Sequence, residues 1–256
     1  MVFIPKITAV SYLNTIPFVY GLQHADNLRA DLTLAPPADC ARNYIEGKAD
    51  IALLPVAVVP ELHDTNIVTD YCIGAVGAVR TVTVMSNEPI TSAKRIWLDS
   101  HSRTSVQLCG YLAKNKWRIA PEWLHLSDYS RVEHPEAGDA FLLIGDKVFD
   151  YEGRFPYVYD LAIEWREVTK LPFAFAVWVA RKGVPYEITD ELQRALTFGV
   201  EHTWEAVAES KYMGSDAGVT AYDYLTRNID FILDEEKHKA LKKFWDAGIR
   251  IVPRSY

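Results

Sequence analysis

The hydrophobic positions of this chain follow two patterns: short continuous apolar runs, and longer stretches with apolar residues at three-to-four spacing. Short runs rich in β-branched and aromatic side chains are typical of buried strands. They predict strands at 7–10, 30–34, 49–54, 66–73, 79–85, 95–98, 122–125, 140–144 and 173–180. The longer pattern is typical of helices that bury one face. It predicts helices at 17–22, 36–47, 105–116, 161–169, 191–210, 215–229 and 234–247.

Strands and helices alternate in two separate series, one before residue 88 and one after it. Such alternation is typical of α/β folds with mostly parallel sheets. The order predicts two lobes, with residues 1–87 plus 176–256 in a discontinuous first lobe and residues 88–175 in the second. This arrangement resembles the type 2 periplasmic-binding-protein fold, in which two lobes close over a ligand cleft. A single doubly wound sheet is the alternative.

The first polar turn, residues 11–15, follows the first predicted strand. It contains Ser11, Asn14 and Thr15, and the next helix begins near Pro17, a residue that suits a first helical turn. In α/β proteins ligands bind at the carboxyl ends of parallel strands. The unpaired amides of a helix start also suit a carboxylate. The alternative is an ordinary capped helix, because Ser, Thr and Asn are common cap residues.

The second polar turn, residues 100–105, reads Ser-His-Ser-Arg-Thr-Ser and leads into a helix. Its hydroxyls and the helix amides could hold a carboxylate through charge-assisted hydrogen bonds. Alternatively, Ser102 or Thr104 caps the helix. Arg80 and Arg103 could each bind a carboxylate through the forked guanidinium, or remain solvated surface charges.

Two titratable residues are candidates for proton transfer. Asp146 follows an apolar strand and could act as an acid, a base or an orienting group, with a helix cap as the alternative. His101 lies within the second polar turn, although a lone loop histidine is more often merely exposed. The histidines show no metal-ligand spacing, so no metal site is predicted. The sequence also contains no glycine-rich nucleotide motif and no GxSxG nucleophile motif.

Several aromatic residues could form a flat apolar wall for a ring-shaped ligand. Aromatic residues in apolar strands are more often part of the core, and that is the alternative here. The residues concerned are Tyr12, Phe18, Phe173, Phe175 and Trp178.

Composition narrows the range of partners and compartments. The net charge is −7 and the pI is near 5.5, so there is no basic surplus to neutralise the phosphates of a nucleic acid. No apolar run approaches the ~18 residues of a membrane span, and the N-terminus lacks a signal-peptide pattern. The three separated cysteines, Cys40, Cys72 and Cys109, suggest reduced, buried thiols. We therefore expect a cytoplasmic protein with no nucleic-acid or membrane partner.

An ordered set of motifs resembles a known family. The set is Ser11-Tyr-Leu-Asn-Thr-Ile-Pro17, Gly47-Lys-Ala-Asp-Ile-Ala-Leu53, Thr104-Ser-Val106, Leu142-Leu-Ile-Gly-Asp146, Tyr157-Val-Tyr-Asp-Leu161 and Leu171-Pro-Phe-Ala-Phe-Ala-Val-Trp178. Together these motifs resemble the chorismate dehydratases of the futalosine pathway to menaquinone. The resemblance implies a two-lobed periplasmic-binding-protein-like fold used for catalysis. It also implies removal of water from chorismate to give 3-[(1-carboxyvinyl)oxy]benzoate, without a cofactor.

The resemblance also assigns roles to residues. Ser11 and Asn14 would contact the substrate, and Thr104 and Ser105 would hold a carboxylate, with Asp146 or a substrate carboxylate accepting the proton. Further binding residues would be Tyr12, Thr81, Ser102 and Gly145. Arg80 is a binding candidate from its own position beside Thr81, not from the family pattern.

This sequence departs from the family pattern at two places. The loop after the predicted strand 49–54 reads Pro55-Val-Ala, where the family often has serines, and Arg80 stands where a smaller residue is expected.

Three other functions share the predicted fold. The sister enzyme, dihydroxynaphthoate synthase, opens with a different first-turn motif. A solute-binding receptor would need the missing signal peptide, and a regulator would need a DNA-binding helix pair. The sequence does not determine the oligomeric state, and a homodimer is one possibility.

Overall fold

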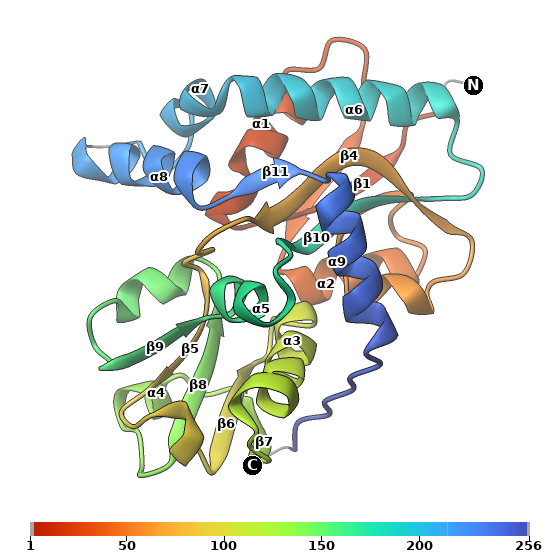
Figure 1. Ribbon diagram of the computed structural model, residues 1–256. Coiled ribbons are helices and arrows are strands. Elements are labelled where there is room, and N and C mark those ends of the chain that lie inside the picture. The colour runs from red at the N-terminus through yellow and green to blue at the C-terminus, as the bar shows by residue number, and fades with distance from the viewer. Residues whose placement is uncertain (1–2, 214, 255–256) are drawn as a thin grey trace. The chain divides into compact units, whose positions relative to one another are not determined.

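The computed structural model describes residues 3–213 and 215–254, and the side chains among them except those of 215–217. The chain forms two compact units, each with its own sheet (Figure 1). Unit 1 comprises Met1–Ala75 and Ala174–Glu235, and unit 2 comprises Val76–Phe173 and Glu236–Tyr256.

Unit 1 contains a six-stranded sheet in the order β11-β4-β10-β3-β1-β2. Its strands are β1 (Lys6–Val10), β2 (Asp31–Ala35), β3 (Ile51–Pro55), β4 (Thr65–Ala75), β10 (Phe173–Arg181) and β11 (Asp230–Ile232). Strands β2 and β3 run parallel to β1, and β10 runs antiparallel to β3. The helices of the unit are α1 (Ile16–Gln23), α2 (Pro37–Ile45), α6 (Tyr186–Glu201), α7 (Thr203–Ala208) and α8 (Ser215–Arg227). The carboxyl ends of β1, β2 and β3 therefore share one edge.

Unit 2 contains a five-stranded sheet in the order β7-β6-β8-β5-β9. Its strands are β5 (Val82–Ser86), β6 (Arg95–Asp99), β7 (Glu122–Leu126), β8 (Asp139–Ile144) and β9 (Tyr157–Asp160). The helices are α3 (Thr104–Leu112), α4 (Ser130–Glu133), α5 (Leu161–Thr169) and α9 (Glu235–Asp246). Strands β7 and β8 run parallel to β6, while β5 runs antiparallel to β8 and β9.

The core of unit 1 is built around the α1 helix. Phe18 is fully buried and packs edge-on against Tyr71, Trp178 and Phe231. Helices α1 and α6 approach so closely that glycine is required on both. A Cβ on Gly21 would lie 1.9 Å from the Ala195 carbonyl oxygen, and one on Gly199 would lie 1.9 Å from that of Pro17. This glycine contact fixes the helix that follows the first polar turn.

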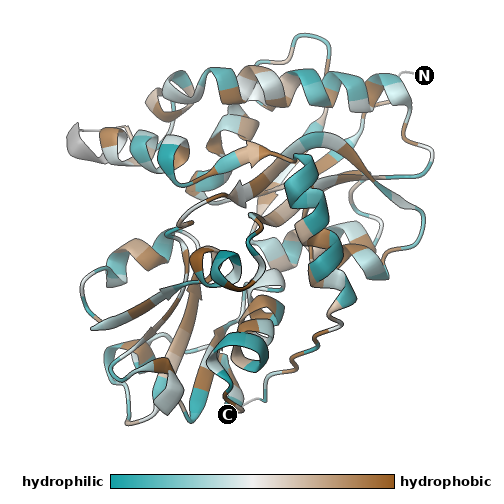
Figure 2. Ribbon diagram, viewed as in Figure 1, coloured by the Kyte–Doolittle hydropathy of each residue, from teal (hydrophilic) through white to brown (hydrophobic). Residues whose placement is uncertain are grey.

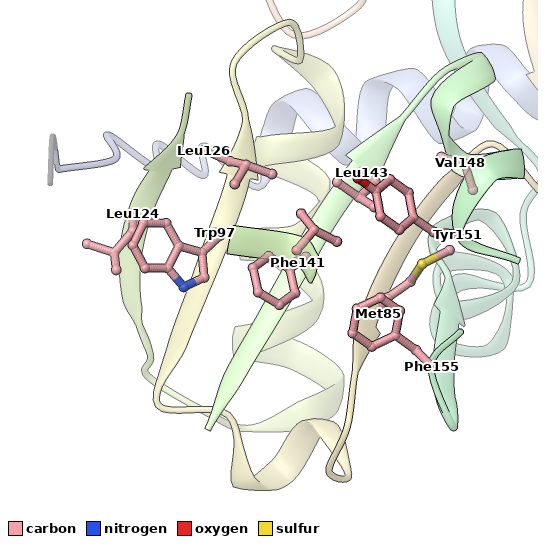
Figure 3. Close-up of a cluster of buried hydrophobic side chains, with 10 residues drawn as sticks. Met85, Trp97, Leu124, Leu126, Phe141, Leu143, Val148, Tyr151 and Phe155 are labelled. Atoms are coloured by element: carbon pink, nitrogen blue, oxygen red, sulfur yellow. The ribbon is translucent and has the colours of Figure 1, made fainter. Parts of the chain in front are cut away.

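The core of unit 2 includes a cluster of large apolar side chains on one face of the sheet (Figure 3). Trp97 on β6 lies opposite Phe141 on β8 and Leu124 on β7. Val132 of α4 and Tyr151 join the same cluster, and Tyr129 packs against it. Figure 2 shows that α6 and α9 alternate hydrophobic and hydrophilic residues along their length, as helices with one buried face do.

Most of the predicted elements are present, but several boundaries differ. The predicted helix 191–210 begins at Tyr186 and is divided at His202 into α6 and α7. The predicted helix 105–116 ends as α3 at Leu112 and continues as a π-helical turn, Ala113–Trp117. The predicted strand 79–85 begins only at Val82, because Arg80 has a φ of +66° that no regular strand accommodates. Strand β11 was not predicted.

Two segments also group differently from the predicted lobes. Residues 76–87 belong to unit 2, because β5 pairs with β8 and β9. Residues 236–256 belong there as well, because Phe244 of α9 packs edge-on against Trp165 and Phe173. The tail after α9 then adds to the sheet, where the His125 amide donates to the Arg254 carbonyl.

The cysteines are free and buried, as predicted. Burial raises the pKa of Cys40 to about 11, so this thiol is a poor nucleophile at neutral pH. None of the helices in the described ranges is long and apolar enough to span a bilayer.

Candidate active site

The first polar turn lies at the carboxyl edge of the unit 1 sheet. Ser11 directly follows β1, and its amide donates to the Ala35 carbonyl at the end of β2 at 3.0 Å. A short 3-10 helix, Leu13–Thr15, leads into α1, in which Pro17 stands in the first turn. Ser11 is exposed and Asn14 is half-buried. The prediction that this turn joins a first strand to a first helix is confirmed.

The capping alternative for this turn is not what the structure shows. No side chain caps either the 3-10 helix or α1. The Asn14 Oδ1 accepts a hydrogen bond of 3.1 Å from the hydroxyl of Thr15. That contact orients the Asn14 amide through its neighbour rather than through the helix start.

A hollow of about 320 Å³ adjoins the first polar turn within unit 1. Its volume is within the usual range for small-molecule sites. Ser11 and Tyr12 line one part of it, and Lys211 and Tyr212 line another. The Lys211 ammonium lies 5.0 Å from the centre of the Tyr212 ring. The hollow therefore combines hydroxyls, aromatic rings, the Lys211 ammonium and the carboxylate of Glu209.

The predicted aromatic wall divides into two parts. Tyr12 lines the hollow beside Ser11. Phe18, Phe173 and Trp178 are almost completely buried, so for them the core alternative is confirmed. Phe175 is also buried, and its carbonyl accepts a hydrogen bond from the Val56 amide in the loop after β3.

The second polar turn lies at the corresponding edge of the unit 2 sheet. It follows β6 and leads into α3 at Thr104. Ser102, Thr104 and Ser105 are all buried. The Ser102 hydroxyl accepts a hydrogen bond of 3.2 Å from the Ser105 amide, although the N-cap position of α3 is Arg103, which makes no side-chain cap. The first turn of α3 carries no acidic residue, which leaves its positive end available to an anion.

Strand pairing brings three more predicted residues to this edge. Ile144 at the end of β8 lies opposite Val82 at the start of β5, so the residues just beyond them are neighbours. The Gly145 amide donates to the Thr81 carbonyl at 2.9 Å. Gly145 has a φ of +74°, a conformation that favours glycine, and half-buried Asp146 begins the 3-10 helix that follows.

Arg80 is held by contacts of its own. Its amide donates to the Asp160 carboxylate at 2.7 Å, and its guanidinium binds Glu152 through two hydrogen bonds of 2.6 and 2.8 Å. The guanidinium also lies 5.1 Å from the centre of the Phe149 ring. Burial raises the pKa of Asp160, although backbone amides, that of Arg80 first among them, oppose the rise.

Sequence reasoning missed a charged network at this same edge. Asp99 ends β6, and its carboxylate is completely buried. It accepts hydrogen bonds from the Tyr129 hydroxyl at 2.9 Å and from the Lys147 ammonium at 2.8 Å. No spacing rule relates positions 99, 129 and 147. The one usable signal was an aspartate that ends an apolar strand just before the hydroxyl-rich turn.

Each unit by itself presents polar groups at its strand ends: hydroxyls and the Lys211 ammonium in unit 1, and hydroxyls, helix amides and the Lys147 ammonium in unit 2. Among the side chains that the structure describes, no three His, Cys, Asp or Glu residues are grouped as metal ligands would be.

Solved structures resemble this fold over nearly the whole chain. Protein AF1704 from Archaeoglobus fulgidus is 18% identical, with a TM-score of 0.71, covering 94% of this chain and 95% of its own. The Candida albicans CA3427 gene product, described as having the generic periplasmic binding protein fold, is 12% identical with a TM-score of 0.63, covering 96% and 91%. The aliphatic sulphonate binding protein SsuA from Escherichia coli is 12% identical with a TM-score of 0.61, covering 97% and 94%. The predicted periplasmic-binding-protein-like fold is confirmed.

Sequence comparisons identify the family. A chorismate dehydratase from Thermus thermophilus is 27% identical over 244 residues, which cover 87% of this chain and 88% of that protein. A family model described as menaquinone biosynthesis matches residues 5–249. The chain therefore belongs to the menaquinone biosynthesis family.

Proposed function

We propose that this protein is a chorismate dehydratase, which removes water from chorismate to give 3-[(1-carboxyvinyl)oxy]benzoate in menaquinone biosynthesis. The observation that carries the proposal is the similarity to the Thermus thermophilus chorismate dehydratase over 87% of the chain, together with the family match. The polar groups at the strand ends of each unit, taken by itself, suit a carboxylate.

The reaction asks little of the protein beyond positioning and proton transfer. A ring proton and the ring hydroxyl leave from adjacent saturated carbons as water, and the remaining ring becomes aromatic. The driving force therefore resides in the substrate. The protein must orient the ring, help to remove the proton and stabilise the departing hydroxyl.

In unit 1, we assign Ser11 and Asn14 to contact with the reacting part of the substrate and Tyr12 to its ring. Ser11 and Tyr12 line the hollow of about 320 Å³, and Asn14 lies in the same turn. The Asn14 amide is oriented by the Thr15 hydroxyl. A preoriented amide can donate to a developing negative charge without first reorganising.

In unit 2, we assign Thr104 and Ser105 to binding of a carboxylate at the start of α3. Both residues are buried, and the Ser102 hydroxyl fixes the Ser105 amide. Helix-start amides and hydroxyls hold carboxylates through charge-assisted hydrogen bonds. Thr81 and Gly145, joined through their backbones, would contribute further contacts at this edge.

Two assignments concern charge. Asp146, or a carboxylate of the substrate itself, accepts the ring proton in this proposal. Arg80 is retained as a substrate contact, but its guanidinium already binds Glu152 and would have to leave that carboxylate. We further propose a cytoplasmic location.

Incubation of the purified protein with chorismate tests the proposal directly. Mass spectrometry should show a product lighter by one water, with the ultraviolet spectrum of a substituted benzoate. A parallel sample of the Asn14→Ala variant should form little product. The resemblance to SsuA keeps one other function in view, an anion-binding protein without catalysis. Binding of chorismate by the wild-type protein without loss of water would establish that function and reject the dehydratase.

A further inference from the structure

The carboxylate of Asp99 lies at the carboxyl end of β6 in unit 2 and accepts hydrogen bonds from protein groups. It is fully buried at the end of β6, and each of its oxygens accepts two hydrogen bonds. Oδ1 accepts from the His101 amide at 3.0 Å and from the Tyr129 hydroxyl at 2.9 Å. Oδ2 accepts from the Ile144 amide at 3.2 Å and from the Lys147 ammonium at 2.8 Å. Asp99 thus ties the ends of β6 and β8 to the second polar turn.

Lys147 has a different role in the network from that of Asp99. Its Nζ donates to Asp99 and, at 2.6 Å, to the Tyr129 hydroxyl, which in turn donates to Asp99. An ammonium has three donors, and these contacts use two of them. The Lys147 side chain is 23% exposed, whereas that of Asp99 is 0% exposed. The network therefore opens to solvent at the lysine.

Lys116 in the same unit provides a comparison. Its side chain is also 23% exposed, but its ammonium lies between two carboxylates, those of Glu164 at 2.7 Å and of Glu167. Lys147 has one carboxylate and one neutral phenol. Two carboxylates saturate Lys116 with negative charge. Lys147 instead has one N–H donor that these contacts leave for a further acceptor.

Lys147 lies at the same end of the unit 2 sheet as the groups that we assign to carboxylate binding. It follows Gly145 and Asp146 directly, beyond the end of β8. The Ser102 amide donates to the Asp99 carbonyl at 3.1 Å, so the residue that holds the lysine also anchors the turn before α3. Tyr129 packs against the apolar cluster of Figure 3, which restricts its ring. The ammonium is therefore positioned by two groups that cannot easily move.

We propose that Lys147 is a substrate-binding residue whose ammonium binds one carboxylate of the substrate, and that Asp99 and Tyr129 are positioning residues that hold this ammonium. The inference rests on the proposed function and deepens it, because it adds a fixed cation to a site that the sequence analysis built from hydroxyls and amides. In this proposal Asp99 and Tyr129 position the Lys147 ammonium in addition to stabilising unit 2.

The test compares Lys147→Met with Lys147→Arg, Tyr129→Phe and the control Lys116→Met, using chorismate turnover and calorimetric binding of isophthalate. Isophthalate is an aromatic dicarboxylate, and benzamide serves as its uncharged counterpart. A charge-assisted hydrogen bond contributes about 1.5–3 kcal/mol. Lys147→Met should therefore raise the KM for chorismate and the Kd of isophthalate by about 10- to 100-fold, with benzamide binding unchanged. Lys147→Arg should recover much of the loss, and Lys116→Met should change neither constant.

Tyr129→Phe removes no charge, and it tests the role of Lys147 if the Lys147→Met protein does not fold. It should raise KM and the Kd of isophthalate together by about three- to tenfold, with kcat within about twofold of wild type. Unchanged KM and Kd in a folded Lys147→Met protein, or in Tyr129→Phe if that protein is the one that folds, would overturn the inference. If wild type binds isophthalate but does not dehydrate chorismate, the proposed function fails while the isophthalate comparison still decides the role of Lys147. Absence of isophthalate binding by wild type would reject that role.

Discussion

The two strand-end edges of this protein hold their polar groups by different means. In unit 1 the first polar turn is fixed by backbone contacts, from the Ser11 amide to Ala35 and through a 3-10 helix into α1. In unit 2 a buried carboxylate, Asp99, fixes the second polar turn and the end of β8 at the same time. The position of the first polar turn is thus set by packing of the helix that follows it. The position of the second polar turn is set by hydrogen bonds to the buried Asp99 carboxylate.

Because of this difference, the two units should be destabilised by different kinds of substitution. A buried carboxylate that loses its partners costs several kcal/mol, so unit 2 is sensitive to changes of charge. The α1 helix of unit 1 is held against α6 at Gly21 and Gly199, so unit 1 is sensitive to added volume. Substitutions chosen for each mechanism should therefore separate the two edges.

The largest expected effect is on catalysis at the first edge. Asn14→Ala removes an amide that the Thr15 hydroxyl orients. Loss of one preorganised donor to a developing charge typically costs about 10²–10³ in kcat. We expect a loss of that size with a melting temperature close to that of wild type, measured by chorismate turnover and thermal unfolding. Asn27→Ala, at an exposed position, is the matched control. Near-normal dehydration by Asn14→Ala would remove this residue from the site.

The next effect is on the stability of unit 1. A Cβ at Gly199 would lie 1.9 Å from the backbone oxygen of Pro17, and backbone atoms cannot move aside as a side chain can. Gly199→Ala should therefore lower the free energy of unfolding by about 3 kcal/mol or more, measured by urea denaturation. Nothing lies within 4 Å of a Cβ built on Gly77, so Gly77→Ala should change it by no more than about 0.5 kcal/mol. Equal effects of the two alanines would show that the helices do not need glycine here.

The third effect is on the charge network of unit 2. Asp99→Asn removes the charge that balances Lys147 and leaves a buried donor facing other donors. Breaking a buried pair costs about 3–5 kcal/mol, and partial exposure of Lys147 reduces this to about 2–3 kcal/mol. Asp190→Asn breaks an exposed pair with Arg194 on α6 and should cost less than about 1 kcal/mol. Urea denaturation of both variants measures the contrast, which a loss below 1 kcal/mol in Asp99→Asn would contradict.

Structural features that depend on neighbouring residues could be predicted from the sequence, and those that depend on contacts distant in the chain could not. The first polar turn was predictable because Ser11 follows an apolar run directly and Pro17 indicates a helix start. The division of helix 191–210 at His202 was not, because three-to-four spacing continues through the break. The grouping of α9 with unit 2 depends on Phe244 meeting Trp165 and Phe173, a contact between residues distant in the chain.

The candidate site shows the same division. The hydrogen bond from the Ser105 amide to the Ser102 hydroxyl is local, because the two residues are three apart, and residue type suggests it. The network of Asp99, Tyr129 and Lys147 could not, because three different elements bring those residues together. The positive φ of Arg80 was equally hidden, since arginine rarely adopts that conformation and nothing nearby in the sequence requires it.

A smaller effect is expected from the hydroxyls of the second polar turn. Thr104→Val and Ser105→Ala remove hydroxyls but leave the amides of the helix start in place. Since each hydrogen bond to a charged group contributes about 1.5–3 kcal/mol and the amides remain, we expect KM for chorismate to rise about tenfold with kcat nearly unchanged. Steady-state kinetics measures both constants. Ser130→Ala, at a hydroxyl bound to Asp128, is the matched control, and an equal change in KM there would contradict the assignment.

The smallest effect concerns Arg80 and tests whether it belongs to the site at all. Glu152→Gln releases the guanidinium from a pair in which both side chains are more than one-third exposed. Exposed pairs contribute about 0.2–1 kcal/mol, so stability should hardly change in urea. If Arg80 contacts the substrate, its release from Glu152 should lower KM for chorismate by about twofold, because the competing carboxylate is gone. Glu133→Gln, which breaks the similarly exposed pair with Arg154, should leave KM unchanged. A KM for Glu152→Gln equal to that of the control would assign Arg80 to the packing of unit 2, where it lies against Phe149, and not to the substrate.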